Sequence, residues 1–208
     1  MGKAKSVFFC QNCGAESSKW MGRCPQCGEW NTLVEEIIKE TKHSRTPSRG
    51  VGNQTTKPTA LPDIEISSLA RVSTTFGEID RVLGGGIVPG ALMLLGGDPG
   101  IGKSTLLLQV SQKVADTVGT VLYASGEESQ LQLKLRAERL HINSERLQVI
   151  ADTDLDHILE QADTMMPSLL VIDSIQTMYT GDIDAAPGSV SQVRECTSRL
   201  LRFCKERN

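Results

Sequence analysis

The sequence predicts an α/β fold with a mainly parallel sheet, preceded by a small module built around four cysteines. Three observations lead to this prediction. Short apolar runs alternate with helical segments from about residue 67 onward, which is the pattern of a parallel sheet with helices on both faces. A glycine-rich segment joins one apolar run to a helix, and two pairs of closely spaced cysteines lie near the N-terminus.

The alternation of apolar runs and helical segments can be assigned element by element. The apolar runs, such as ALMLLGG at 91–97 and LLVID at 169–173, have almost no polar interruption. Strands of parallel sheets are covered on both faces and carry such unbroken runs. We expect strands at 91–97, 120–125, 147–151 and 169–173, and helices at 103–116, 128–140, near 155–165 and at 189–206.

Composition divides the chain into three parts. We expect residues 1–34 to form the cysteine module, 35–66 a linker and 67–208 the α/β domain. The linker prediction depends on residues 41–60, which are mostly polar, Gly or Pro and hold four positive and no negative charges. Such a segment buries too little apolar surface to offset the entropy that is lost on ordering.

Charge and hydropathy narrow the class of protein. The 208 residues carry a formal net charge of -3, with 9 basic against 5 acidic residues in 1–60. Because residues 1–60 are net basic and residues 61–208 are net acidic, contact with a polyanion is favoured at the N-terminal end. The sequence holds no apolar run of about 18 residues and no signal-peptide pattern, so we expect a cytoplasmic protein without a membrane partner. In that compartment clustered cysteines are more typical of metal binding than of disulfides.

The segment between the first strand and its helix carries the clearest motif. Gly97 to Ser104 match G-x-x-x-x-G-K-[ST] in full. Such a loop turns its backbone N–H groups toward phosphate oxygens, and the helix N-terminus adds positive potential. A glycine-rich turn without ligand is the alternative, but the flanking strand and helix argue against it. Lys103 is expected to reach the β- and γ-phosphates and act in catalysis, and Ser104 to bind Mg²⁺. The predicted ATP-binding residues are Gly97, Asp98, Pro99, Gly100, Ile101, Gly102, Lys103, Ser104 and Thr105.

Three carboxylates follow the later strands. Asp173 ends the run LLVID, which is the Walker B pattern and predicts a residue that holds Mg²⁺ directly or through water. Glu127 and Glu128 follow the strand at 120–125, and the carboxyl ends of strands in doubly wound sheets face the ligand. We assign Glu127 as the residue that activates the attacking water and Glu128 as a helper or cap. Alternatively, both merely begin the next helix, where the helix dipole favours acidic residues.

The four N-terminal cysteines have the spacing of a metal site. Cys10, Cys13, Cys24 and Cys27 form C-x₂-C-x₁₀-C-x₂-C, and a glycine follows each pair. Two thiolates from one tight turn can bind the same metal, and the glycine permits the left-handed backbone there. Four thiolates in a closed site favour structural Zn²⁺. A module this small cannot build a sufficient hydrophobic core and needs a bound metal for stability. The alternative, a pair of redox-active CxxC motifs, lacks the fold that normally surrounds them.

The aromatic and basic residues of this module leave alternatives open. Trp20 and Trp30 flank the second cysteine pair and could stack on nucleotide bases, but we favour the interpretation that they cover a small core. Four basic side chains either contact phosphates or form ordinary surface: Lys3, Lys5, Lys19 and Arg23. Cys196 and Cys204 are expected to be core thiols on one face of the last helix.

Four segments of the chain resemble the family of bacterial DNA repair proteins called RadA or Sms. They are TTFGEIDRVLGGGIVPGALMLLGGDPGIGKSTLLLQ at 74–109, YASGEES at 123–129, VIDSIQTM at 171–178 and APGSVSQVRE at 186–195. The cysteine pairs and the linker match as well, so the resemblance covers nearly the whole chain. It implies a RecA-like P-loop ATPase domain after a four-cysteine zinc ribbon.

The resemblance also implies a function and partners. Members of the family are ATP-dependent motors of homologous recombination that bind single-stranded and branched DNA, promote branch migration beside a RecA-type recombinase and form hexameric rings. Carried over by position, it assigns ATP binding to residues 97–105, Mg²⁺ to Asp173, zinc to the four cysteines and water activation to Glu127.

The family continues past the equivalent of Asn208 with a further ATPase strand, a KNRFG motif and a Lon-protease-like domain. We therefore expect 67–208 to be an ATPase domain that is incomplete at its C-terminus. In RecA-like sheets the further strand lies between the segments equivalent to 91–96 and 169–173. These two should then be neighbours without a hydrogen-bond ladder, and the isolated chain should fold poorly and bind ATP weakly.

Two other functions fit parts of the sequence. A signalling ATPase of the KaiC type shares the P-loop and the paired glutamates, but the zinc ribbon argues against it. The second alternative is a non-catalytic interaction module, in which the bound nucleotide determines which partner is bound. Retention of the P-loop, Glu127 and Asp173 argues against a dead site. The loop from Tyr179 to Ser189 lies where RecA-like proteins carry a DNA-binding loop, although Asp182 and Asp184 oppose direct phosphate contact.

Overall fold

The computed structural model describes residues 5–38, 60–63 and 71–207 of the chain. Most of the predicted linker, 35–66, lies outside these residues, so its boundaries stay a prediction. Residues 5–38 form a three-stranded antiparallel sheet of order β2-β1-β3, made of β1 (Lys5–Cys10), β2 (Glu16–Ser17) and β3 (Leu33–Ile38). A short 3₁₀ turn, Leu61–Asp63, follows within the linker.

Residues 71–207 alternate helices and strands as the sequence predicts. The parallel sheet has the order β5-β4-β6. Helix α5 begins one residue after its cap, Ser189, whose hydroxyl accepts from the Gln192 N–H, which is a common way to satisfy a first-turn amide. The elements are α1 (Gly77–Val82), α2 (Lys103–Thr117), β4 (Val121–Ser125), α3 (Gln130–Arg139), β5 (Leu147–Ala151), α4 (Leu155–Met165), β6 (Leu169–Asp173) and α5 (Val190–Glu206).

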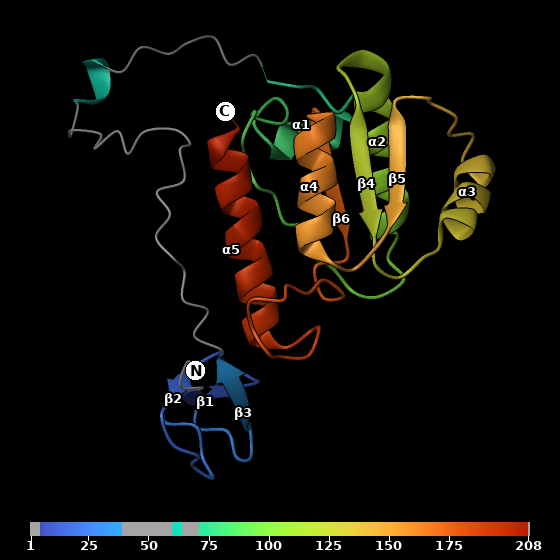
Figure 1. The fold of residues 1–208 in the computed structure, drawn as a ribbon. Coiled ribbons are helices and arrows are strands. Elements are labelled where there is room, and N and C mark those ends of the chain that lie inside the picture. Colours follow the sequence, from blue (N-terminus) through green and yellow to red (C-terminus); the bar gives the residue numbers. More distant parts are fainter. Residues whose placement is uncertain (1–4, 39–59, 64–70, 208) are drawn as a thin grey trace.

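Helices cover both faces of the parallel sheet (Figure 1). On one face Leu155 and Ile158 of α4 pack with Cys196 and Leu200 of α5 against Ala124. On the other, α2 and α3 pack against the sheet through buried apolar side chains, namely Leu108, Tyr123, Leu133, Ile142 and Val171. This three-layer arrangement explains the apolar sequence of the middle strand, because every residue of β4 is buried.

The predicted strand at 91–97 is wrong, because this segment forms no strand. Its apolar side chains are solvent-exposed, and Leu94 reaches 88% exposure. A strand requires a neighbour for its backbone N–H and C=O groups, and among the described residues no ladder joins 91–96 to β6, whose only partner there is β4. The absence of a ladder between these two segments was expected. The apolar composition was correctly recognised, but composition does not reveal whether a partner strand is present.

Asp80 organises the segment before α1. Its carboxylate accepts hydrogen bonds from the Ser73 hydroxyl at 2.6 Å, the Thr74 hydroxyl at 2.7 Å and the Thr74 N–H at 2.8 Å. These donors, the Ser73 hydroxyl foremost, hold the pKa of Asp80 below its usual range. The TTFGEID sequence is therefore a structural turn, which sets the entry of the chain into the domain.

The zinc-ribbon sheet lies beside the start of α5 (Figure 1). An Arg194 guanidinium nitrogen donates to the Gly14 carbonyl at 3.3 Å and lies 3.7 Å from a carboxylate oxygen of Glu16. A Cβ built on Gly14 would come within 2.9 Å of Val190, so only glycine permits this approach. None of the helices in the described residues is both long and apolar enough to span a bilayer.

Gly126, between β4 and Glu127, lies too close to the loop after β6 to carry a side chain. A Cβ there would be 2.0 Å from Thr177 Oγ1 and 2.8 Å from Thr177 Cβ. We predict that Gly126→Ala lowers the free energy of unfolding by about 1–3 kcal/mol, the usual effect of overpacking. Urea unfolding followed by circular dichroism measures it. Gly181→Ala is the control, since a Cβ there would contact nothing within 4 Å, and equal stability of the two variants would contradict this packing.

Candidate nucleotide site and metal centre

The predicted nucleotide-site residues meet at one edge of the parallel sheet. Along α2, Val114 and Ala115 pack with Val121 at the start of β4, whereas Leu108 packs with Tyr123 further along the strand. Helix α2 therefore runs opposite to the strands, and its N-terminus points to their carboxyl ends. The arrowheads of β4 and β5 point to this same edge in Figure 1. The P-loop, Glu127 and Asp173 thus share the edge where ligands bind in open α/β sheets.

The P-loop has the backbone that its glycines predict. Gly100 and Gly102 have φ values of 80° and 104°, which non-glycine residues rarely adopt. Gly102 is the N-cap of α2, and no side chain caps the helix there, so its first N–H groups are available to an anion. The Lys103 ammonium donates to the carbonyls of Gly97 and Asp98, both at 2.9 Å. The Lys103 side chain thus folds back over the phosphate-binding loop.

Asp173 is positioned by a tyrosine that sequence reasoning missed. Asp173 follows Val171 by two residues and therefore points to the face that α2 covers. The hydroxyl of the fully buried Tyr123 donates to Asp173 Oδ2 at 2.6 Å. Burial, together with this carboxylate, raises the pKa of Tyr123, so the phenol stays protonated and remains a donor. The position of Tyr123 in a strand predicts only a core residue. The strand register is needed to show that its hydroxyl contacts Asp173.

Glu127 lies beside Asp173 because of the pairing between β4 and β6. The parallel register sets Ser125 opposite Asp173, and the Gly126 N–H donates to the Asp173 carbonyl at 2.9 Å. Beyond this bond the Ser174 hydroxyl donates to Glu127 Oε1 at 2.9 Å. Glu127 is exposed, and Ser174 orients its carboxylate at the sheet edge. The sequence analysis did not identify Ser174.

Glu128 is held on the helix side instead. One of its carboxylate oxygens pairs with the Arg136 guanidinium on α3, and its N–H donates to the Ser125 hydroxyl at 3.0 Å. Its other oxygen, Oε2, is buried without a hydrogen-bond partner. The ion pair supports the view that Glu128 fixes α3 to the site. Because its Oε2 has no partner, Glu128 is the second candidate, after Glu127, for activating the attacking water.

The four cysteines of the zinc ribbon converge on one point. Their sulfur atoms all lie within 4.8 Å of one another, and Cys10–Cys27 and Cys13–Cys24 are both separated by 3.6 Å. Four thiolates at about 2.3 Å from one zinc ion would lie about 3.8 Å apart in a tetrahedron. The cysteine geometry therefore fits a closed tetrahedral metal site, formed by the CxxC turns at 10–13 and 24–27.

The two turns share one hydrogen-bond pattern. In the first turn the Gly14 N–H donates to the Cys10 carbonyl, and in the second the Gly28 N–H donates to the Cys24 carbonyl. Gly14 and Gly28 have φ values of 72° and 78°, as the position of these glycines predicts. Each turn leaves its two sulfur atoms on the side of the metal.

Hydrogen bonds favour the thiolate form at two of the four cysteines, whereas burial and the three neighbouring cysteines raise the pKa of Cys13 to about 12. The Thr32 hydroxyl lies 3.2 Å from Cys10 Sγ and lowers the pKa of this thiol to about 6. The Cys27 N–H lowers the pKa of Cys24. Because the thiolate is the form that binds metal, these two neighbours favour metal binding at Cys10 and Cys24.

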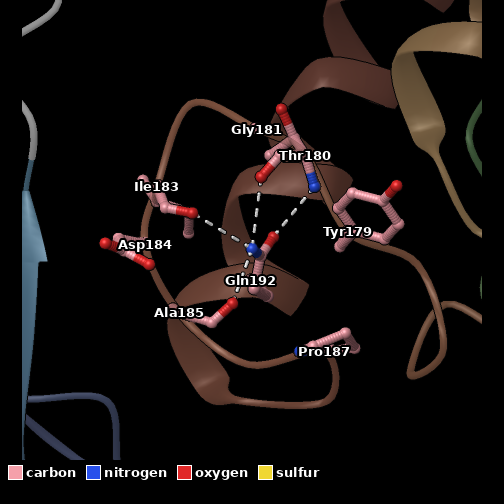
Figure 2. A pocket seen from close by; sticks show the side chains of 8 residues that line it. All are labelled: Tyr179, Thr180, Gly181, Ile183, Asp184, Ala185, Pro187 and Gln192. Carbon is pink, nitrogen blue, oxygen red and sulfur yellow. Dashed lines mark hydrogen bonds between the residues drawn. The ribbon is translucent and has the colours of Figure 1, made fainter.

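The loop from Tyr179 to Ser189 is organised by one buried glutamine (Figure 2). Gln192 is 1% exposed. Its amide nitrogen donates to the carbonyls of Thr180, Ile183 and Ala185 at 3.2, 3.4 and 2.9 Å, and its oxygen accepts from the Thr180 N–H at 3.1 Å. Gln192 thus binds the loop backbone from inside, which the sequence did not reveal.

The charge of this loop is partly neutralised. Arg199 on α5 contacts Asp182 at 3.0 Å and also pairs with Asp156 on α4. Asp182, one of the two acidic residues that oppose a phosphate contact, is therefore paired with a cation that it shares with Asp156.

Comparison with known proteins agrees with the fold and with these two sites. The family described as AAA domain matches residues 55–208, and the family described as rubredoxin metal binding domain matches residues 8–35. The first match covers most of the chain and includes the P-loop, both glutamates and Asp173. The chain belongs to the AAA-domain family. Its AAA domain has the RecA-like P-loop fold with a parallel sheet, and a four-cysteine zinc ribbon precedes it.

Three relatives that align with nearly the whole chain, ribbon and AAA domain together, share the same name. The chain is 55% identical to the DNA repair protein RadA of Bacillus subtilis over 206 residues, 50% identical to that of Halalkalibacterium halodurans over 205, and 52% identical to that of Listeria monocytogenes over 210. The alignments cover 99–100% of this chain and 45–46% of each relative. The chain thus spans about half the length of the curated relatives it matches, and the predicted resemblance to this family is confirmed.

The metal centre yields a prediction on metal content. We predict one zinc ion per chain, and its loss in the double variant Cys10→Ser/Cys24→Ser, because two of the four thiolates are removed. Elemental analysis of the purified chain measures it. Cys204→Ser, which changes a half-buried thiol on α5, should retain the full amount. Zinc in the double variant at the level of the control would contradict this assignment.

The hydrogen bond between Tyr123 and Asp173 yields a second prediction. In the full-length protein, Tyr123→Phe should raise the Mg²⁺ concentration for half-maximal binding of a fluorescent ATP analogue about fivefold, since one hydrogen bond contributes about 1 kcal/mol. Tyr179→Phe, which alters the only other tyrosine of the chain, is the matched control. An unchanged Mg²⁺ dependence in Tyr123→Phe would show that Tyr123 does not position Asp173.

Proposed function

We propose that this chain forms part of a DNA-dependent ATPase of DNA repair and homologous recombination, which binds single-stranded DNA and promotes branch migration. This proposal is supported by the geometry at the carboxyl ends of the strands, where Glu127 lies beside Asp173 and the N-terminus of α2 points to the same edge. The chain is also 55% identical to a protein named DNA repair protein RadA. ATP is the substrate, Mg²⁺ its metal partner and Zn²⁺ the structural ion of the ribbon.

The P-loop residues bind and neutralise the triphosphate. Lys103 now donates to two loop carbonyls, and in the complex it exchanges these bonds for β- and γ-phosphate oxygens. Backbone N–H groups of the loop residues other than Pro99 donate to the same phosphates, aided by the N-terminus of α2. Ser104 and Asp173 hold Mg²⁺, which supplies positive charge for the developing negative charge of phosphoryl transfer.

Glu127 orients the attacking water and accepts its proton. The water oxygen forms a bond to the γ-phosphorus, the bond from this phosphorus to the bridging oxygen breaks, and ADP and phosphate leave. Ser174 keeps one carboxylate oxygen of Glu127 fixed, which leaves the other oxygen for the water. The pairing of Glu128 with Arg136 supports a structural role for Glu128.

The partners of this ATPase are proposed from the family resemblance. We propose single-stranded and branched DNA as ligands, a RecA-type recombinase as partner and a hexameric ring as the assembly, in the cytoplasm. The loop 179–189, held by Gln192, is a candidate for DNA contact at the ligand edge. A KaiC-type signalling ATPase would share the nucleotide site, but its turnover would not respond to single-stranded DNA.

Substitution of the two glutamates tests the catalytic assignment. In the full-length protein, Glu127→Gln should bind ATP nearly normally and lose about 10²–10⁴-fold in turnover, the usual contribution of a general base. Lys103→Ala should lose nucleotide binding as well. Measured with and without single-stranded DNA, wild-type turnover should rise with DNA. Glu128→Gln is the matched control, and loss of turnover in this variant but not in Glu127→Gln would reverse the assignment.

A further inference from the structure

The two tryptophans of the zinc ribbon lie on its surface. Trp20 and Trp30 are 59% and 66% exposed, so the prediction that they cover a small core is wrong. The core of the ribbon is complete without them, because Cys10, Cys24 and Leu33 are buried and Phe8 and Ala15 pack against these residues. Large aromatic side chains are rarely left this exposed in a compact module without a binding role.

The two rings form one surface rather than two isolated ones. Both rings adjoin Gly22, where a Cβ would be 3.6 Å from the Trp30 ring and 3.8 Å from the Trp20 ring. The backbone also fixes their relative position, since the Asn31 N–H donates to the Gly22 carbonyl at 2.8 Å and Arg23 pairs with Trp30 in a β-bridge. Both segments adjoin the second cysteine turn, so the rings are presented on a rigid support.

Basic side chains flank this aromatic surface. The Arg23 guanidinium lies 5.8 Å from the centre of the Trp30 ring, and its Nε donates to the Gly28 carbonyl at 2.7 Å. Lys19 is exposed next to Trp20. Of the nearby acidic residues, Glu29 is exposed next to Trp30, whereas Glu16 lies in β2 and faces Arg194. One side of the ribbon thus faces α5. The two tryptophans, together with Lys19 and Arg23, are exposed to solvent.

We propose that Trp20 and Trp30 form a stacking site for two unpaired bases of single-stranded nucleic acid, with Lys19 and Arg23 contacting the adjoining phosphates. Exposed aromatic rings beside cations suit this ligand, because every base has a π-face and every nucleotide carries a negative charge. A paired duplex hides these faces, so the site distinguishes single strands from duplex. The choice of nucleic acid rather than protein as ligand rests on the proposed function in DNA repair.

The chain offers a direct spectroscopic test, because Trp20 and Trp30 are its only tryptophans. Titration of the 208-residue chain with oligo-dT should quench its tryptophan fluorescence, whereas a duplex of equal length should not. Trp20→Ala and Trp30→Ala should each weaken binding about tenfold by fluorescence anisotropy of a labelled strand. Trp30→Phe should retain most of the affinity. Arg23→Ala should reduce the dependence of binding on salt concentration.

A matched control separates loss of the site from loss of the fold. Val34→Ala removes another exposed apolar side chain of the ribbon and should bind oligo-dT normally, with the metal content unchanged in every variant. Absence of quenching at saturating DNA, or equal affinity of the Trp→Ala variants and Val34→Ala, would overturn the proposal. Quenching by a recombinase without any effect of oligo-dT would replace it with a protein-binding surface.

ATP turnover of the full-length protein without DNA distinguishes failure of this site from failure of the ATPase proposal. Trp20→Ala and Trp30→Ala should keep this basal turnover while losing part of its stimulation by single-stranded DNA. Wild-type protein that binds oligo-dT through these rings but hydrolyses no ATP would overturn the proposed function and leave the stacking site standing.

Discussion

The parallel pairing of β4 with β6 is the constraint on which the nucleotide site depends. Its register sets Ser125 opposite Asp173, and one further hydrogen bond, from the Gly126 N–H to the Asp173 carbonyl, carries the contact past the end of the sheet. Ser174 and Glu127 meet because of this bond, and Tyr123 reaches Asp173 from within the same two strands. A slip of one residue would turn Asp173 to the opposite face.

The zinc ribbon depends on a different constraint, which is local. The CxxC turns at 10–13 and 24–27 and the glycines that follow each of them direct four sulfur atoms to one point. A module with so few buried apolar side chains needs a metal to offset the entropy of ordering. Because the metal supplies the stability, Trp20 and Trp30 are not required for the core. Their large exposed surface is thereby available for binding.

Much of the fold follows from periodicity and local signals. The strands at 147–151 and 169–173 agree with the observed bounds, and capping residues mark the helix starts. The strand at 91–97 failed because apolar composition reveals neither burial nor the presence of a hydrogen-bond partner, and this segment is solvent-exposed. Motifs located the P-loop and the four cysteines, but the roles of Tyr123 and Gln192 arise from register and packing. Two tryptophans in a small module look like core until its actual core is known.

The central claim is that one sheet edge holds the phosphates, the metal and the attacking water. It is tested most directly by a crystal structure of the full-length protein with Mg²⁺ and a non-hydrolysable ATP analogue. We predict that the γ-phosphate lies at Lys103, that Mg²⁺ lies between Ser104 and Asp173, and that a water beside Glu127 is in line with the γ-phosphorus. A triphosphate bound away from residues 97–105, or an in-line water held by Glu128 alone, would contradict this account.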